Sequence, residues 1–455
     1  MINIEFEYHK ISTTIKVNDN ELFQIAAQKF VFHTQLEFNN FLFLYDKRKI
    51  KMTDIIKNVI NESDKKTNKM KVKALFLNDI CNFENIRSKY VIKTMFNFLN
   101  KKKVFDITKY CKNIQIRSDI NKNYYKKILN IEIEILPCEN VEGEFVNFDH
   151  HKKPYYHIYF NDSQEEQSKY CIHKTDQIKN IKIIINGEVK SLNGLFRNCE
   201  CINSINFKQF FRNDIIDMQY MFSGCSSLKE INFSNFNTKK VIGMRYMFSG
   251  CLSLKQLDLY NFNTSKVTDM RSMFSECSSL KELNISNFNT NNVTDMSCMF
   301  WNCSCLKEMN LSSFNTSKVT DMSDMFSGCS SLEKLNLSNF KTNKVTNMNG
   351  MFYNCTSLKG LNISNFNTRK TVNMSCMFFG CISLKYLNLS NFNTYNVIDM
   401  SHMFEKCSSL KELNISDFKT GHETNMKSMF FQCNSLEKFD IYKFNRDHWD
   451  DMFVN

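Results

Sequence analysis

Several features that common functional classes require are missing from this sequence. No stretch approaches the roughly 18 consecutive apolar residues of a membrane-spanning helix. The N-terminus, MINIEFEYHK, lacks the basic start and apolar run of a secretory signal. The sequence shows no paired carboxylates, no nucleotide-binding loop and no nucleophile grouped with a general base. The sequence therefore predicts no membrane span, no enzyme and no cofactor.

Proline and glycine are also scarce, with 2 Pro and 11 Gly in 455 residues, whereas 42% of the residues are apolar. This composition is typical of a folded chain that is long enough for several domains. The net charge of +12 comes from scattered lysines. Nucleic-acid binding would require clustered cations with interleaved aromatics. The lysines therefore indicate a solvated surface, and nucleic acid is not an expected partner.

The 18 cysteines are numerous for a chain without an export signal. We expect them to be thiols in a reducing compartment. Asn-X-Ser sequons recur, for example at Asn232, Asn284, Asn310 and Asn336, where glycans would fit poorly on closely stacked strands. A cytoplasmic location is therefore expected, with the cell surface as the alternative.

A 26-residue phrase recurs about ten times. Aligned on MFSGC, the copies place a cysteine at the same position each time: Cys199, Cys225, Cys251, Cys277, Cys303, Cys329, Cys355, Cys381, Cys407 and Cys433. A fixed period in the twenties is typical of a solenoid. One copy cannot bury its own apolar face, so neighbouring copies must stack.

The first half of each copy has a helical spacing. Met322, Met325, Phe326 and Cys329 lie at i, i+3, i+4 and i+7, which predicts a short helix of about two turns. Asp321 precedes it, and the other copies have Ser, Asp, Asn or Gly there. These residue types favour helix N-caps, so position 321 and its equivalents are predicted to be caps.

The second half predicts a strand. Leu332, Leu335 and Leu337 end in an alternation, followed by Phe340. Stacking the copies predicts one parallel sheet with a buried aromatic spine. The spine residues are Phe210, Phe236, Phe262, Phe288, Phe314, Phe340, Phe366, Phe392, Phe418 and Phe444. The predicted fold is an α/β solenoid of short helix plus parallel strand units over residues 191–455.

The phrase SLKELNISNFNTNNVTDMSCMF resembles the BspA-like leucine-rich repeats, and the resemblance covers about residues 191–455. It implies a leucine-rich-repeat-like solenoid that binds proteins, and some bacterial members are adhesins. This chain differs from those adhesins in its missing export signal and its large N-terminal region. Both differences weigh against a surface role.

Four roles are open to the repeated cysteine. Zinc needs about four converging ligands, whereas one cysteine per copy supplies a line. Equal spacing gives no reason to pair one neighbour rather than the other in a disulfide, and no histidine recurs beside the thiols as a base. We interpret the cysteine as a small packing residue at a corner. An upstream group is the alternative place for metal, although its spacing matches no zinc motif: Cys138, His150, His151, His157, Cys171 and His173.

Residues between the buried leucines are predicted to point outward in two ladders. One is nearly invariant, which we interpret as amide stacking: Asn232, Asp258, Asn284, Asn310, Asn336, Asn362, Asn388, Asn414 and Asp440. The other varies, and with three tyrosines it is the candidate partner surface. Its members are Glu230, Gln256, Glu282, Glu308, Lys334, Gly360, Tyr386, Glu412 and Lys438, with Tyr260 and Tyr442 beside them. Ordinary exposed residues are the alternative reading.

Residues 1–78 read as a hairpin (2–17), a helix (ELFQIAAQKFVFH), a strand (FLFLYDKRKI), a short helical segment and a last strand (MKVKALFL). This order resembles a ubiquitin-like α+β domain, which implies a binding module with Phe43 as the candidate contact. Phe43 packing against the next segment is the alternative. The chain continues without a Gly-Gly end, so conjugation to targets is not expected.

Two further segments separate that domain from the repeats. Residues 79–130 are predicted to form a helical connector, whose YVIKTMFNFLNKKKVFDITKYCKNIQ loosely resembles an F-box without its usual Leu-Pro start. Residues 131–190 contain strand-like runs that are predicted to cover the first copy. At the other end, Trp449 and Phe453 are candidates to cap the last one.

These observations favour a non-catalytic protein-interaction scaffold with a ubiquitin-like module. A surface adhesin and a ubiquitin-ligase substrate adaptor are the alternatives. The partner is an unidentified protein, and the sequence leaves the oligomeric state open.

Overall fold

The structure is a computed structural model. It describes residues 2–8, 11–17, 41–45, 48–49, 69–76 and 129–454, except 149, 235, 422 and 445–448. The chain divides into two units, residues 1–128 and 129–455. The predicted helix at ELFQIAAQKFVFH, the segment TDIIKNVI and the F-box-like segment lie outside the described residues.

The first unit contains one five-stranded sheet. Its strands are β1 (Ile2–Tyr8), β2 (Ile11–Val17), β3 (Phe41–Tyr45), β4 (Arg48–Lys49) and β5 (Lys69–Phe76), in the order β2-β1-β5-β3-β4. β1 pairs antiparallel with β2 and parallel with β5. β3 pairs antiparallel with both β4 and β5. The hairpin and both later strands predicted for this region are therefore present.

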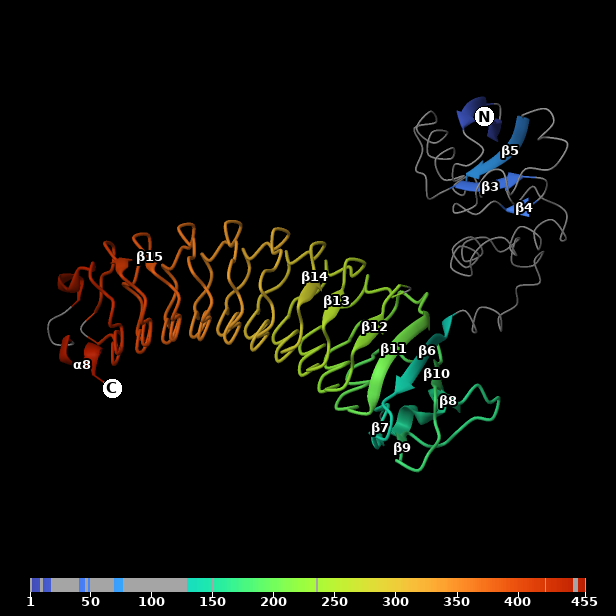
Figure 1. Cartoon of the computed structure of the whole chain (residues 1–455), viewed down its shortest axis with the longest axis horizontal. Coiled ribbons are helices and arrows are strands. Elements are labelled where there is room, and N and C mark those ends of the chain that lie inside the picture. Colours follow the sequence, from blue (N-terminus) through green and yellow to red (C-terminus); the bar gives the residue numbers. More distant parts are fainter. Residues whose placement is uncertain are drawn as a thin grey trace. The chain divides into compact units, whose positions relative to one another are not determined.

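The second unit begins with a sheet that leads into the repeats (Figure 1). Its elements are β6 (Ile131–Pro137), β7 (Gly143–Glu144), the 3-10 helix η3 (His150–Tyr155), β8 (Tyr156–Phe160), β9 (Cys171–Ile172), β10 (Ile181–Ile185) and β11 (Ile202–Gln209). β8, β10, β6 and β11 pair antiparallel in that order. β11 then pairs parallel with β12 (Glu230–Asn232), the first short strand of the repeats. β6, β8 and β10 thus share one sheet with β11 and β12, whereas β7 and β9 pair in a separate two-stranded sheet.

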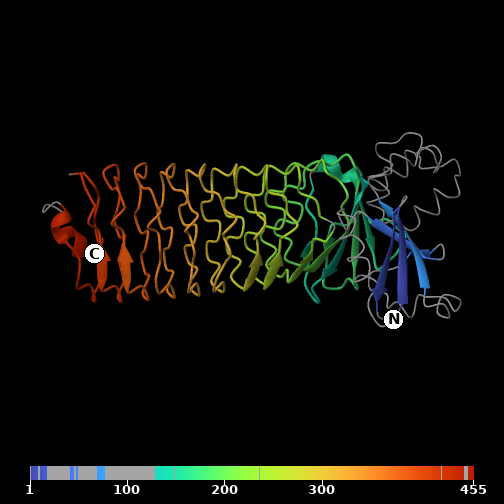
Figure 2. The ribbon, with the colours of Figure 1, turned by 90° about the horizontal axis from the view of Figure 1, so that it is seen from above.

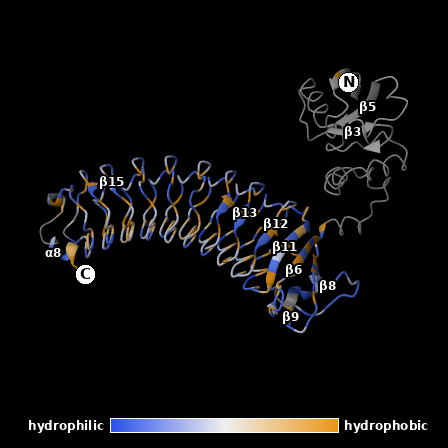
Figure 3. Cartoon of the chain, in the orientation of Figure 1, coloured by the Kyte–Doolittle hydropathy of each residue, from blue (hydrophilic) through white to orange (hydrophobic). Residues whose placement is uncertain are grey.

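The repeats stack as successive coils along a gently bowed axis, which runs straight in the perpendicular view (Figures 1 and 2). We call each 26-residue coil a rung. The remaining elements are β13 (Gln256–Asp258), β14 (Glu282–Asn284), β15 (Tyr386–Asn388), β16 (Glu412–Asn414), the 3-10 helix η4 (Ile441–Lys443) and α8 (Trp449–Phe453). Hydrophobic residues recur in every rung (Figure 3). Their buried side chains form a single core.

The predicted short helix in each rung is wrong. The segment after Asp321 forms consecutive turns instead, with positive φ at Asp324 (53°) and Gly328 (73°). Residues in this left-handed region end a right-handed helix. Alternate amides then point along the solenoid axis: Met322 N donates to Asn347 O at 3.0 Å and Phe326 N donates to Met351 O at 3.0 Å.

The prediction of inward-facing residues is nevertheless confirmed, because Met322, Met325, Phe326 and Cys329 are all fully buried. Turns that repeat every four residues bring the same positions inward as a helix with 3.6 residues per turn. The predicted cap contact is also present, since Asp321 Oδ1 accepts from Ser323 N at 2.8 Å. It closes a turn rather than starting a helix.

The predicted continuous sheet on the leucine side is interrupted. β13 pairs only with β14, and β15 only with β16, in separate two-stranded sheets. A regular ladder runs instead through the residues just before each turn segment. There Thr346 N donates to Thr320 O at 2.9 Å, and parallel bridges link the same positions from Ser191↔Asp217 to Asp399↔Asn425.

Two aromatic columns fill the core. The predicted spine is buried throughout, with exposures of 0–7%. Its rings stack in parallel only in places, such as Phe288 on Phe314 at 6.4 Å. The second column consists of Phe326 and its equivalents in the other rungs, and we call it the Phe326 column. Its rings stack without a break from Phe196 to Phe430, with ring centroids 5.4–5.7 Å apart. The sequence assigned that column to a helix face, so the continuous stack is a feature of the structure alone.

Each end of the stack is covered by a different element. β6 covers the first rung by pairing with β11, and β10 pairs with the other edge of β6. At the far end, Phe430 N donates to Met452 O at 2.8 Å and Ser428 N donates to Asp451 O at 2.8 Å. Met452 is fully buried, Trp449 packs against the core and Phe453 is 44% exposed. α8 therefore accepts the axial amides of the last rung. Within the described part of the chain, no helix has the length and hydropathy needed to cross a bilayer.

The repeated cysteines are packed, as predicted, and also hydrogen-bonded. Those from Cys199 to Cys407 are fully buried, and Cys433 is partly buried. From Cys225 onward, each Sγ donates to the phenylalanine carbonyl of the preceding rung at 2.8–3.2 Å, as Cys329 does to Phe300 O. The described cysteines are all free thiols.

We predict that Phe314→Ala lowers the free energy of unfolding by about 3–5 kcal/mol, because it leaves a cavity in a fully packed column. Phe326→Ala should cost at least as much, since its ring stacks on both neighbours. Urea unfolding of the full chain measures both. Tyr395→Ala is the control: this side chain is 74% exposed, and a change within about 0.5 kcal/mol is expected. A comparably small change for Phe314→Ala would contradict the buried spine.

We also predict that the ladder thiols are inert in the native protein. Burial raises the pKa of Cys329 to about 12, so only about one thiol in 10⁴ is ionised at pH 8. Peptide mass spectrometry after iodoacetamide treatment should show Cys329 unmodified in buffer and modified in urea. The partly exposed Cys138 and Cys171 are the internal comparison. Equal native rates for Cys329 and Cys138 would contradict the prediction.

Candidate functional site

The variable ladder forms one exposed row across the short strands. Glu230, Gln256, Glu282, Tyr386 and Glu412 open β12, β13, β14, β15 and β16. Gln256 lies directly opposite Glu282, and Tyr386 opposite Glu412. Glu308, Lys334 and Lys438 occupy the same repeat position and are also exposed, whereas Gly360 is partly buried. We call this set the variable row.

The row extends onto β11 of the first rung and onto β6, which precedes the repeats. Ser204 of β11 lies opposite Glu230 on one side and Leu136 of β6 on the other. Leu136 is 44% exposed. In the neighbouring row, Asn206 lies opposite both Asn232 and Glu134, and Lys208 Nζ contacts Glu134 Oε2 at 2.7 Å. Ser204 and Asn206 lie one 26-residue period before Glu230 and Asn232. The sequence offered no signal for Leu136 and Glu134, because the β6–β11 register depends on two segments about 70 residues apart.

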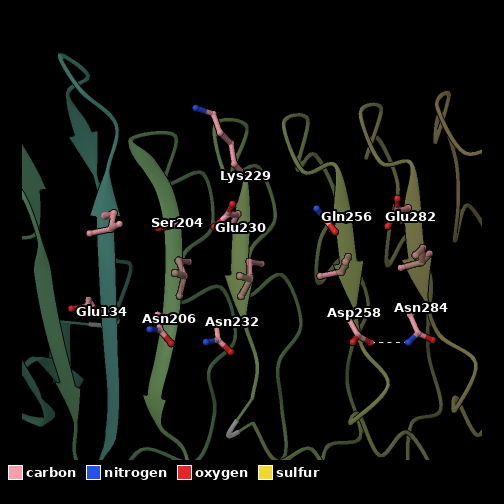
Figure 4. Close-up of a pocket in the computed structure, with 15 residues that line it drawn as sticks. Glu134, Ser204, Asn206, Lys229, Glu230, Asn232, Gln256, Asp258, Glu282 and Asn284 are labelled. Atoms are coloured by element: carbon pink, nitrogen blue, oxygen red, sulfur yellow. Dashed lines mark hydrogen bonds between the residues drawn. The ribbon is translucent and has the colours of Figure 1, made fainter.

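The two rows border a shallow groove of about 780 Å³ that spans β6 and β11–β14 (Figure 4). The half-buried Ile231 and Leu283 lie between the rows. Carboxylates of Glu134, Glu230, Asp258 and Glu282 line the groove, as does Lys229. A second hollow of about 550 Å³ continues along the row past Glu308, Lys334, Gly360 and Tyr386. The surface is long, polar and shallow, and this shape suits an extended protein partner better than a small molecule.

The nearly invariant ladder has a structural role that differs from the predicted amide stacking. Each Oδ1 accepts the backbone N–H two residues later, as Asn336 does from Ser338 at 3.0 Å. The same contact recurs from Asn232 to Asp440. A side-chain contact between rungs is made by Asn284 Nδ2, which donates to Asp258 Oδ1 at 2.9 Å. The ladder is uniform because each rung needs the same turn closed.

The three predicted tyrosines do not form one cluster. Tyr386 belongs to the variable row, whereas Tyr260 lies in the turn after β13 and Tyr442 lies in η4. Their exposed fractions are 64%, 54% and 75%. Tyr260 and Tyr442 are seven rungs apart, or about 34 Å at a strand spacing of ~4.8 Å. They cannot act together as a single hot spot.

Charges along this face pair between rungs in two places. Lys438 Nζ donates to Glu412 Oε1 at 2.6 Å, and this hydrogen bond raises the pKa of Lys438. Lys359 Nζ contacts Glu333 Oε2 at 3.2 Å. Each pair includes one rung in which the usual Lys-Glu order is reversed, at Glu333-Lys334 or at Glu437-Lys438. The reversal brings opposite charges together in neighbouring rungs. The sequence therefore alters the charge pattern of the row without altering its backbone.

The upstream histidines and cysteines separate into pairs. His157 Nδ1 contacts Glu166 Oε1 at 2.9 Å, and Cys171 Sγ lies 3.9 Å from His173 Nε2. The side chains of His150 and His151 are outside the described residues. Across the residues that the structure covers, no group of three or more His, Cys, Asp or Glu side chains is placed to hold a metal ion.

Phe43, the candidate contact of the first unit, lies on β3 opposite Ala74 of β5. Its side chain is outside the described residues.

We predict that Asn336→Ala lowers the free energy of unfolding by about 1 kcal/mol, because the turn loses its side-chain acceptor. Asn336→Asp should change it by much less, since Asp258 and Asp440 make the same contact in other rungs. Urea unfolding compares the two variants. An Asp variant as unstable as the Ala variant would support amide stacking instead.

Comparisons with known proteins give a family and weak structural similarities. A search of curated proteins found no match. Among solved structures, a leucine-rich cell surface protein from Faecalibacterium prausnitzii A2-165 matches with 16% identity and a TM-score of 0.29, over 57% of this chain and 78% of that chain.

Two further structures match over smaller shares. The TLR13–ssRNA13 complex matches with 17% identity and a TM-score of 0.25, over 52% of this chain and 32% of that chain. ATBAG1 in complex with HSP70 matches with 11% identity and a TM-score of 0.15, over 26% of this chain and 81% of that chain. These TM-scores are too low to establish a fold or a function.

The family comparison covers most of the repeats. The sequence pattern of one family matches residues 190–283, 276–385 and 353–454, which together are more than half of the chain. Its description is "Mycoplasma protein of unknown function, DUF285". The matched segments coincide with the rungs, as expected for a repeat protein of the BspA-like kind. This chain belongs to the DUF285 family.

Proposed function

We propose that this protein is a non-catalytic scaffold that binds a protein partner along the variable row. The observation that carries the proposal is the difference between two adjacent rows on the same face. The residues of the nearly invariant ladder are uniform and accept hydrogen bonds from the backbone of their own rung. The variable row is exposed and changes from rung to rung. Specificity requires positions that are free and differ, and the variable row has both properties.

The groove beside β6 is the proposed centre of the contact. It combines the exposed Leu136 and the half-buried Ile231 and Leu283 with four carboxylates. Protein interfaces combine an apolar centre with a polar rim. The acidic residues favour a partner with basic side chains, and the order of charges along the row sets its direction.

A non-enzymatic role is supported by the state of the thiols as well as by the family. Burial raises the pKa of Cys277 and Cys381 to about 12, the opposite of what an activated nucleophile requires. Repeat families of this kind are in general non-catalytic.

The first unit is proposed to be a ubiquitin-like binding module. The order β2-β1-β5-β3-β4, with a parallel β1–β5 pair, supports this proposal. The strand order agrees with the resemblance seen in the sequence, and Phe43 is the proposed contact on β3.

We propose a cytoplasmic location for the scaffold. The second candidate function is an adhesin at the cell surface. The resemblance to BspA-like repeats favours the second. Glycans on Asn284, or the native protein found outside the cell, would support the adhesin and exclude the cytoplasmic role. The ubiquitin-ligase adaptor stays a prediction, because its segment lies outside the described residues.

The experiment uses the full chain with a photocrosslinking residue at Gln256. We expect a discrete crosslinked protein that is lost in the variant Glu230→Lys, Glu282→Lys and Glu308→Lys, because reversed charge repels a basic partner. The control changes three exposed carboxylates away from the row: Glu139→Lys, Glu165→Lys and Glu188→Lys. It carries the same charge change and should keep the crosslink. Loss in both variants, or in neither, would overturn the proposed surface.

A further inference from the structure

A second surface runs along the turns that follow the strand face of each rung. In seven successive rungs a β-turn is closed by a backbone hydrogen bond of 2.9–3.0 Å, as from Val241 N to Thr238 O. The two central residues of these turns are Lys239–Lys240, Ser265–Lys266, Asn291–Asn292, Ser317–Lys318, Asn343–Lys344, Arg369–Lys370 and Tyr395–Asn396. We call this set of turn tips the basic ridge.

Buried threonines hold the ridge in register. Thr238 Oγ1 donates to Asn263 O at 3.0 Å and accepts from Asn263 N at 2.7 Å, so each turn is fixed to the next. The same pair of bonds joins Thr264 to Asn289 and Thr290 to Asn315. With about 4.8 Å between rungs, the tips form a line roughly 30 Å long.

The ridge carries charge of one sign. Every charged side chain on the tips is cationic and exposed: Lys239, Lys240, Lys266, Lys318, Lys344, Arg369 and Lys370. Among the ion pairs of the described residues, none involves these seven side chains. Lys318 Nζ donates to the neutral Asn292 Oδ1 at 2.8 Å. The cations of the ridge are therefore not paired with acidic side chains.

Exposed aliphatic side chains flank both ends of the ridge. Two residues after the tips, Ile216 and Ile242 are 48% and 49% exposed in neighbouring rungs, and Val372 and Ile398 are 39% and 62% exposed. These positions belong to the axial ladder, where Ile242 N donates to Ile216 O and Ile398 N donates to Val372 O. The rungs between have threonine there: Thr268, Thr294, Thr320 and Thr346.

We propose that the basic ridge binds the solenoid side-on to an anionic lipid bilayer. Acidic headgroups attract each nearby Lys or Arg, and branched aliphatic side chains beside a basic line can enter the headgroup boundary. Nucleic acid fits less well, because a single strand needs interleaved aromatics and the tips have only Tyr395. A duplex needs an element that enters its groove, and these are short turns in a straight row. The ridge is separate from the variable row, so the two proposals can fail independently.

The test is flotation of the full chain with vesicles of phosphatidylcholine containing about one-third phosphatidylserine. The ridge variant is Lys240→Asn, Lys266→Asn, Lys318→Asn, Lys344→Asn and Lys370→Asn. Asparagine already occupies this position at Asn292 and Asn396, so the turns tolerate it. The control removes five cations from the strand side: Lys255→Gln, Lys281→Gln, Lys307→Gln, Lys359→Gln and Lys385→Gln, all exposed in the native chain.

We expect the ridge variant to partition at least about tenfold less onto these vesicles, with the control within about twofold of the native chain. Binding should be absent on pure phosphatidylcholine and should fall as NaCl rises from about 0.05 M to about 0.5 M. Ile242→Thr with Ile398→Thr should weaken binding several-fold while keeping the salt dependence, and threonine is native to this column.

Three results would overturn the proposal. Equal losses in the ridge and control variants would mean that net charge alone is responsible. Equal partitioning onto vesicles with and without phosphatidylserine would exclude recognition of anionic headgroups. Ridge-dependent binding of polyuridylate that outcompetes the vesicles would make nucleic acid the ligand.

Discussion

The backbone amides that point along the solenoid axis impose the constraint on which the rest of the structure depends. A rung cannot satisfy these groups alone, because its turns use only part of its donors and acceptors. The amides of Met322 and Phe326 donate to the next rung, and that of Thr346 donates to the preceding one. The period of 26 residues keeps every donor opposite its acceptor. At the ends, β11 pairs with β6 and the last rung donates to α8.

This constraint explains why so many polar residues repeat with little variation. Asp321, Asn336 and Asn315 each accept from the backbone N–H two residues later, at three places around a rung. Thr316 and Cys329 bond to carbonyls of adjacent rungs. Such positions are fixed by the fold. The variable row and the turn tips are positions where the residue type can change without loss of these hydrogen bonds. Both proposed contacts use these positions.

The two surfaces differ in their chemistry. The variable row mixes signs. Its pair Lys438–Glu412 joins neighbouring rungs, as does the pair Lys359–Glu333 at the preceding position. The basic ridge has one sign. The proposed scaffold would use these two faces to hold a protein partner next to a lipid surface. The buried thiol column contributes packing and hydrogen bonds inside.

The sequence by itself determined the period, the inward-facing residues and the exposed row, because these follow from the spacing of apolar side chains. Met322, Met325, Phe326 and Cys329 are buried as expected. Only the tertiary structure decided that they lie on turns, because turns of four residues and a helix of 3.6 residues per turn give the same spacing. The tertiary structure likewise decided three other features: the hydrogen-bonding role of Asn336, the unbroken Phe326 stack and the extension of the groove to Leu136. In each case the deciding contact depends on local turn geometry or on a partner in another rung or strand, which spacing along one rung does not encode.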